Sequence, residues 1–193
     1  MDRQSVLVDA ALICIARVGL GKTTLDDVAR EAGCARATVY RYFPSKAQLL
    51  KAVVAREAGR LERDVLTAAA SADSLGDAAT AAITTAARLV QHHQALAFVA
   101  AHEPEMLLPH LAFEREDFVL RSAATIVAPA FARFLEPERA ERLGEWIARI
   151  ALSYLCCPSD DFDLSNTEHV RGLVEDFVLP GFVRTVKAEG VTR

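Results

Sequence analysis

Residues 23–46 constrain this chain more than any other segment, because they contain two short helical patterns separated by an Ala-Gly break. Thr24 and Asp27 form a capping box that predicts a helix start, and Gly33 predicts a sharp turn after that helix. In the pattern that follows, Val39 and Phe43 share one face at an i,i+4 interval. The other faces carry polar side chains, namely Arg36, Thr38, Arg41 and Tyr42. An apolar face inside and donors outside are typical of a helix-turn-helix that binds DNA.

Charge placement supports this interpretation, although the whole chain is mildly acidic with a net charge of −4. Residues 1–60 hold ten Lys and Arg against six Asp and Glu, whereas residues 61–193 hold twelve against twenty. No acid stands between Glu31 and Glu57, and this interval contains Arg36, Arg41, Lys46, Lys51 and Arg56. The alternative is an ordinary solvated basic face. Together with the helix-turn-helix spacing, the charges favour a surface that contacts phosphates.

The first fifty or so residues resemble the DNA-binding domain of the TetR family of transcriptional repressors. The resemblance rests on the helix LVDAAL at residues 7–12, the turn at Gly19, and the motifs TLDDVAREAG and TVYRYFPSK. It implies that Thr24, Tyr42 and Lys46 hold DNA phosphates and that Tyr40 lies partly against the DNA backbone. It also implies that Arg36, Thr38 and Arg41 approach base edges.

Two residues depart from the family pattern. Ala35 stands where the family usually has a Ser that caps the recognition helix, which forgoes about 1 kcal/mol of capping. Cys34 stands where a small aliphatic residue is usual. Beyond residue 75 the resemblance is one of architecture only.

Composition predicts an all-α chain. Of its 193 residues 52% are apolar, only nine are Gly and seven Pro, and no run alternates like a β-strand. We therefore expect a three-helix helix-turn-helix domain at residues 1–46 and a helical ligand-binding and dimerisation domain at residues 47–193. No apolar stretch approaches the roughly 20 residues of a membrane span, and no signal-peptide pattern is present. These features predict a cytoplasmic protein without membrane partners.

Helical patterns continue through the second predicted domain. A capping box at Ser45 and Gln48 starts a helix that extends to Ala70, roughly 37 Å at 1.5 Å per residue. Another helix is predicted from residue 75 to about residue 92. A longer one, starting at residue 114, should be bent by Pro129.

The last two predicted helices are apolar on more than one side. The first begins near Pro137, and the second follows a capping box at Ser165 and Glu168 and should be kinked at Pro180. In the TetR family the last two helices form a dimer interface, which the resemblance carries over to this chain. The alternative is that both apolar stripes serve one core. The candidate interface residues are Leu143, Ile147, Ile150, Tyr154, Val174, Phe177 and Phe182.

Residues 75–135 combine several Phe residues with scattered polar groups, a composition that suits a small-molecule pocket. An ordinary core with polar outer faces would have the same composition, and the family resemblance favours the pocket. The basic groups could anchor an acidic head group, so the expected inducer is a fatty-acyl or other hydrophobic compound. The candidate pocket residues are Arg88, His92, Phe98, His102, Phe118, Arg121, Ser122 and Thr125.

Other classes of function find less support. None of the five histidines follows a Glu by three residues, as helical di-metal sites require, so we expect no metal and no other cofactor. No phosphate-binding loop or nucleophile motif suggests an enzyme. The four cysteines, Cys14, Cys34, Cys156 and Cys157, lack metal-ligand spacing. Oxidation of Cys34, or a protein partner, remains an alternative means of control without a small molecule.

Overall fold

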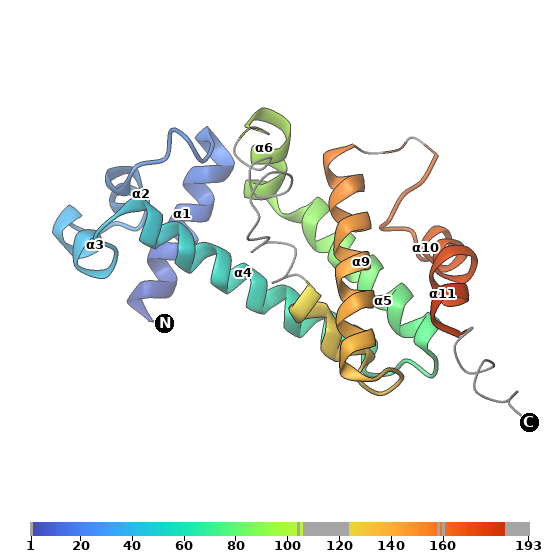
Figure 1. The fold of residues 1–193 in the computed structure, drawn as a ribbon. Coiled ribbons are helices and arrows are strands. Elements are labelled where there is room, and N and C mark those ends of the chain that lie inside the picture. The colour runs from blue at the N-terminus through green and yellow to red at the C-terminus, as the bar shows by residue number, and fades with distance from the viewer. Residues whose placement is uncertain (1, 104, 106–123, 158, 160, 184–193) are drawn as a thin grey trace, which may run out of the picture. The chain divides into compact units, whose positions relative to one another are not determined.

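The structure, a computed structural model, describes residues 2–103, 105, 124–157, 159 and 161–183. These residues form helices and connecting segments without any strand, so the all-α prediction is confirmed for them (Figure 1). The elements are α1 (Arg3–Val18), α2 (Leu25–Glu31), α3 (Arg36–Tyr42), α4 (Lys46–Ala69), α5 (Leu75–His92), α6 (Gln94–His102), η2 (Ala128–Phe131), α9 (Pro137–Cys156), α10 (Thr167–Leu173), η3 (Val174–Val178) and α11 (Leu179–Val183).

The described residues divide into two compact units. The first, which we call the head unit, holds residues 2–60, 90–103 and 105, and the second unit holds residues 61–89 and the described residues from 124 to 183. Helices α4 and α5 each contribute to both units. The sequence suggested a boundary at residue 46 and did not indicate that α6 belongs with the helix-turn-helix.

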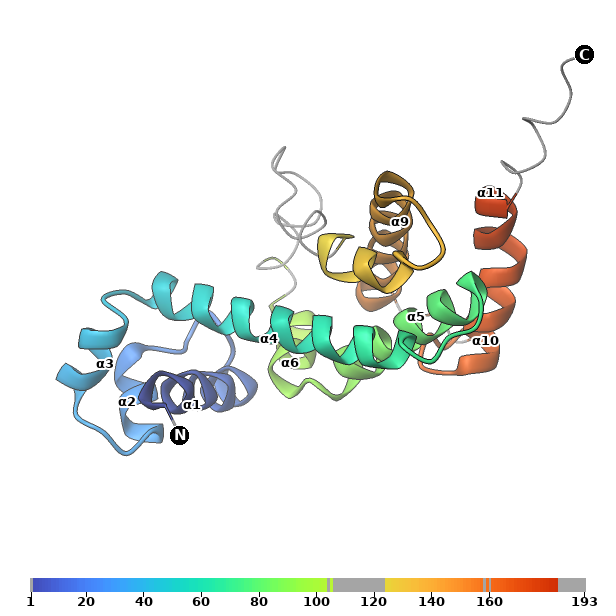
Figure 2. The same cartoon turned by 90° about the horizontal axis from the view of Figure 1, so that it is seen from below.

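Helices α1, α2 and α3 of the head unit pack around the start of α4 (Figure 2). The capping box is present at the start of α2, where the backbone N–H of Asp27 donates to Thr24 Oγ1 at 3.2 Å. Gly33 has a φ of +60° and makes the turn into α3. The core that these helices enclose is apolar and includes Leu7, Val28, Val39, Phe43 and Leu49.

Helix α6 packs on α1 within the same unit. Its residues Ala95 and Val99 cover Ile15 of α1, and all three are at most 5% exposed. The helix begins at His93, whose Nδ1 accepts a hydrogen bond from the Leu96 N–H at 3.1 Å. Its other end is Glu103, the C-terminal capping residue of α6.

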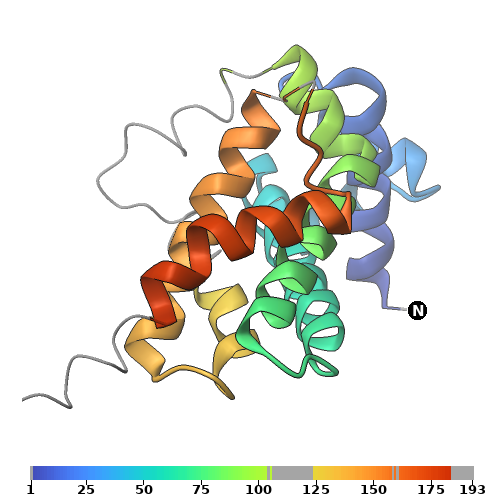
Figure 3. The same cartoon turned by 90° about the vertical axis from the view of Figure 1, so that its right-hand side faces the viewer.

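In the second unit, α5, α9 and the segment from α10 to α11 share one apolar core. Figure 3 shows the α10–α11 segment crossing α5 and α9, and two contacts tie it there. Arg171 pairs with Asp77 of α5 at 2.9 Å, and Arg139 of α9 donates to the Phe182 carbonyl at 2.6 Å. Phe131, Leu143, Ile147, Val170, Val174 and Val178 are among the residues of this core.

The last helix contains a π-type stretch, η3, at Val174–Val178. Pro180 lacks an N–H and its ring would collide with the carbonyl four residues earlier, so a wider turn before it relieves both problems. The wider turn also keeps Val170, Val174 and Val178 on one buried face, because i+4 positions drift around a regular α-helix and the π-type turn offsets that drift. The predicted disturbance at Pro180 is thus a local widening that precedes the proline.

Two local predictions need correction. Asn166, not Ser165, caps α10: its side-chain oxygen accepts from the Glu168 N–H at 2.9 Å, while the Ser165 hydroxyl bonds to Asp163. The helix expected to bend at Pro129 instead ends there, since residues 124–127 are helical and Ala128–Phe131 form the 3-10 turn η2. The first part of that predicted helix lies outside the described residues.

Candidate nucleic-acid interface

Helix α3 presents its polar side chains outward because Val39 and Phe43 hold its other face in the core. Val39 is fully buried and Phe43 is 3% exposed, whereas Tyr40 and Tyr42 are 45% and 39% exposed. Arg41 is exposed and lies over the Tyr42 ring, with 5.5 Å between the guanidinium carbon and the ring centroid. The stacking limits the orientations of the guanidinium.

The start of α3 is held by an ion pair instead of a capping side chain. Ala35 makes no side-chain cap, as its methyl group requires. The guanidinium of Arg36 pairs with the carboxylate of Asp26 on α2. One oxygen of that carboxylate, Oδ1, is buried without a hydrogen-bond partner. Asp26 therefore holds Arg36 close to α2.

Thr24 lies at the N-terminus of α2, on the exposed part of the head unit. Its hydroxyl donates to Asp27 Oδ2 at 2.5 Å and accepts from the Asp27 N–H. The backbone N–H of Thr24 also donates to Asp27 Oδ2. The hydrogen bond from the Thr24 hydroxyl, and then the one from its N–H, lower the pKa of the Asp27 carboxyl below its ordinary value. Asp27 is therefore ionised at neutral pH and keeps the hydroxyl of Thr24 oriented.

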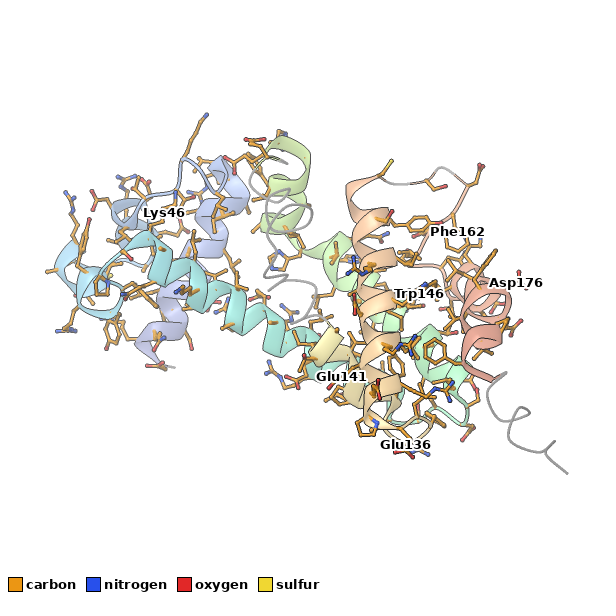
Figure 4. All side chains as sticks on the ribbon, viewed as in Figure 1. Lys46, Glu136, Glu141, Trp146, Phe162 and Asp176 are labelled. Atoms are coloured by element: carbon orange, nitrogen blue, oxygen red, sulfur yellow. The ribbon has the colours of Figure 1, made fainter. Side chains whose placement is uncertain are left out.

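Lys46 begins α4 and is labelled at that position in Figure 4. Its Nζ donates to the carbonyls of Leu20 and Gly21, at 2.6 and 2.9 Å. An ammonium has three donors, so these two bonds leave one donor for a DNA phosphate. The structure thus gives Lys46 a role in holding the turn between α1 and α2, which the sequence did not suggest.

The candidate pocket residues are spread over both units. Arg88 belongs to the second unit and donates to the Ser165 carbonyl at 3.1 Å, and Thr125 of the same unit is exposed. His92, Phe98 and His102 belong to the head unit, where the rings of Phe98 and His102 stack with 4.4 Å between centroids. Phe118, Arg121 and Ser122 lie outside the described residues.

The candidate dimer residues separate into buried and exposed groups. Leu143, Ile147 and Val174 are 0–2% exposed within one chain. They belong to the core of the second unit, so these three predicted interface residues are not part of an exposed contact surface. Ile150 is half-buried, and Tyr154 and Phe182 pack against that core. Phe177 is 73% exposed, the highest exposed fraction among the large apolar side chains of the described residues.

Two charged residues of the head unit could not be singled out from the sequence. Asp26 pairs with Arg36 from ten positions earlier, and Glu103 contacts the turn at Leu20 across 83 positions. Neither spacing follows a local rule, so only the packing of α2 on α3 and of α6 on α1 reveals them.

The described residues include no candidate metal site and no candidate membrane span. That part of the chain contains no cluster of three or more His, Cys, Asp or Glu placed to bind a metal ion. It also contains no helix with the length and apolar character that crossing a bilayer requires. Within it, Cys14, Cys34 and Cys157 are free thiols, and Cys34 is half-buried against the core of the head unit.

Sequence comparison places residues 7–53 in a known family model, described as bacterial regulatory proteins of the tetR family. An uncharacterised HTH-type transcriptional regulator of Mycobacterium tuberculosis strain H37Rv is 29% identical over 182 residues, which are 90% of this chain and 82% of the relative. The HTH-type transcriptional regulator BetI of Agrobacterium fabrum is 42% identical over 66 residues, 34% of this chain and 32% of that protein.

Solved structures share the fold over most of the chain. The TetR-family repressor AlkX from Dietzia, implicated in biodegradation of n-alkanes, has a TM-score of 0.70 and 19% identity over 95% of this chain and 96% of that chain. The transcriptional regulator FadR from Bacillus subtilis, in complex with stearoyl-CoA, has a TM-score of 0.58 and 15% identity over 88% and 96%. At these identities the likeness is one of fold.

Proposed function

Because the chain is a DNA-binding transcription regulator of the TetR family, we propose that it is a cytoplasmic repressor that binds a two-fold-symmetric operator as a homodimer. The observation that carries the proposal is the outward face of α3, where Tyr40, Arg41 and Tyr42 are exposed while Val39 is fully buried. A helix presented in this way fits the major groove, where Arg can donate two hydrogen bonds to guanine.

Dimerisation follows from the reading geometry. A two-fold dimer places two recognition helices in successive major grooves, about 34 Å apart, and thereby reads a palindrome. The exposed Phe177 supports a contact surface on the last helix, because a large apolar side chain gains free energy when a partner covers it.

In vitro selection tests this proposal without knowledge of the operator. The chain is incubated with random 30-base-pair duplexes, and the bound fraction is amplified and sequenced over several rounds. The proposal predicts enrichment of one sequence whose two half-sites are inverted copies, with centres about one helical turn apart. Enrichment of a single asymmetric site would contradict the dimer, and absence of enrichment would contradict DNA reading altogether.

For the inducer we propose a fatty-acyl or similar hydrophobic compound with a polar head group. One observation in the second unit supports a ligand there. Thr80 and Thr84 lie one turn apart on α5, are 3% and 4% exposed, and have hydroxyls without any hydrogen-bond partner. Buried polar groups usually have a partner, and an acceptor atom of a ligand would supply one. Two neighbours in fold are named for n-alkane biodegradation and for a stearoyl-CoA complex.

Calorimetry with stearoyl-CoA and palmitate tests the ligand class. A ligand shifts an equilibrium only by the difference between its affinities for the two states, so an inducer must bind the free protein more tightly than the DNA-bound protein. The matched variants are Thr84→Val, which removes the buried hydroxyl, and Thr67→Val, which removes an exposed hydroxyl of α4. Weaker ligand binding only in Thr84→Val supports the proposal, whereas equal ligand affinities with and without DNA exclude that compound as an inducer.

A further inference from the structure

The turn between α1 and α2 is held from two sides by opposite charges. On one side the carboxylate of Glu103 accepts from the Leu20 N–H at 2.5 Å and from the Gly21 N–H at 3.1 and 3.3 Å. On the other side Lys46 Nζ donates to the Leu20 and Gly21 carbonyls. All four residues belong to the head unit.

The two charges act on the same peptide group. The N–H of Gly21 and the C=O of Leu20 form one planar unit with its donor and acceptor on opposite sides. Glu103 binds the donor and Lys46 the acceptor, so each hydrogen bond polarises the peptide in the direction that strengthens the other. Hydrogen bonds to charged groups are shorter and stronger than neutral ones. The turn is thus a rigid connection between Glu103 and Lys46.

Gly19 makes room for the carboxylate. Its φ of +89° is one that other residues rarely adopt, and a Cβ there would stand 2.5–2.9 Å from the carboxylate atoms of Glu103. The carbonyl of Gly19 is itself fixed by the hydroxyl of Thr23, a residue that is 3% exposed, at 2.6 Å. Both ends of the turn are therefore defined. The carboxylate of Glu103 occupies the space that a side chain at position 19 would need, so glycine suits this position.

The connection reaches the recognition helix through α4. Lys46 is the first residue of α4, and only residues 43–45 separate it from the end of α3. Phe43, in that short link, is 3% exposed, so a shift of the α4 start cannot be absorbed by a loose segment there. We infer that Glu103 is a positioning residue for DNA binding, which acts through the Leu20–Gly21 peptide and Lys46 to fix α3. This inference rests on the proposed function.

The test compares Glu103→Gln with Glu105→Gln. The first variant keeps the shape of the side chain and removes the charge from the turn. The second removes the same charge from an exposed residue two positions away. The probe is the duplex enriched by the parent chain, set beside a scrambled duplex of equal composition, and binding is measured by fluorescence anisotropy. Circular dichroism and thermal melting show how much of each variant is folded.

Glu103→Gln is expected to weaken binding to the enriched duplex about tenfold relative to Glu105→Gln while binding to the scrambled duplex stays equal in the two variants. The amide proton resonances of Leu20 and Gly21 should move upfield in Glu103→Gln and stay in place in Glu105→Gln, because an amide oxygen is a weaker acceptor than a carboxylate. If the carboxylate only stabilised the fold, Glu103→Gln would lower the melting temperature and leave the ratio of the affinities for the two duplexes unchanged.

Equal ratios for the two variants would overturn the inference and leave the proposed function intact. If the parent chain itself enriched no sequence, the proposed function would fail and the inference with it. The variant Glu103→Asp gives a second route, because its shorter side chain withdraws the carboxylate from the Leu20 and Gly21 amides without removing the charge. It should reproduce the loss of discrimination seen in Glu103→Gln, and full discrimination in a folded Glu103→Asp protein would likewise overturn the inference.

Discussion

The guanidinium of Arg36, the first residue of α3, is paired with the carboxylate of Asp26 on α2. The side chain of Arg36 is 68% exposed and that of Asp26 34%, so the pair lies at the surface and contributes little to stability. Its consequence is geometric. The carboxylate restricts the directions in which Arg36 can approach a base and repels phosphates that come near.

Asp26→Asn should lower the discrimination between the enriched and the scrambled duplex about threefold, a cost comparable to that of one exposed ion pair. Binding to the scrambled duplex should become slightly tighter because a negative charge is removed. The control is Glu31→Gln on the same helix, where the carboxylate pairs with Arg17 at 3.2 Å. If both variants discriminate equally, Asp26 does not orient Arg36. Anisotropy titrations of the two duplexes provide the measurement.

Lys46→Met should destabilise the head unit by about 1–2 kcal/mol, because the carbonyls of Leu20 and Gly21 lose their charged partner. It should also weaken binding to the scrambled duplex and reduce the slope of log affinity against log salt by about one if the remaining donor contacts a phosphate. Binding to the enriched duplex should weaken further, because the connection from Glu103 to α3 passes through Lys46. Lys51→Met, at an exposed lysine of the same helix, is the control for stability. Urea denaturation that gave equal midpoints for both variants would argue against the role in the turn.

Phe177→Glu should convert the proposed dimer to monomers without unfolding the chain. Phe177 is 73% exposed in one chain, so a charge there costs little until a partner must bury it. Phe182 is less suitable because it packs against the core and contacts Arg139. Val54→Glu, at an apolar residue that is 56% exposed on α4, is the matched control. Sedimentation should show monomers for Phe177→Glu only, and a dimeric Phe177→Glu would place the interface elsewhere.

The ion pair between Asp77 and Arg171 should make the stability of the second unit depend on pH in the acidic range. The Ser74 hydroxyl and then Arg171 lower the pKa of Asp77 below its ordinary value of 3.8. A carboxyl whose pKa is lowered in the folded state stabilises that state above pH 3.8, and the contribution disappears as the pH falls through the folded pKa.

Asp77→Asn should therefore melt at a lower temperature than the parent chain at pH 6, and the difference should shrink as the pH is lowered from 6 to 2. Thermal melting across this range checks the sign. Asp73→Asn, at an exposed carboxyl in the segment before α5, is the control for removal of a carboxyl group from the same region. If the difference in melting temperature between Asp77→Asn and the parent chain stayed constant from pH 6 to pH 2, the charge of the Asp77 carboxylate would contribute nothing to stability.

The helix-turn-helix could be predicted from the sequence because each of its signals is local. The capping box joins residues three apart, the turn needs one glycine, and Val39 and Phe43 are one helical turn apart. These signals survive without knowledge of tertiary contacts. One of the two local errors, Ser165 for Asn166, arose because two good capping residues stand side by side and only the backbone decides between them.

Long-range relationships could not be predicted in the same way. The apolar stripes of the last two helices indicated burial, but not whether the chain's own core or a partner covers them, and Leu143 and Val174 proved to be in the core. Glu103 looked like one acid among many, because its partner amides lie 82 and 83 positions away. Such pairings depend on how α6 packs on α1, which periodicity does not encode.

The most direct test of the account repeats the in vitro selection with Arg36→Ala and Arg41→Ala. The account predicts that each variant loses sequence preference at particular base pairs, at a cost of about 1–3 kcal/mol, and that the loss appears at equivalent positions of both half-sites because a two-fold dimer uses each residue twice. An enriched sequence identical to that of the parent chain in both variants would show that α3 does not read the DNA.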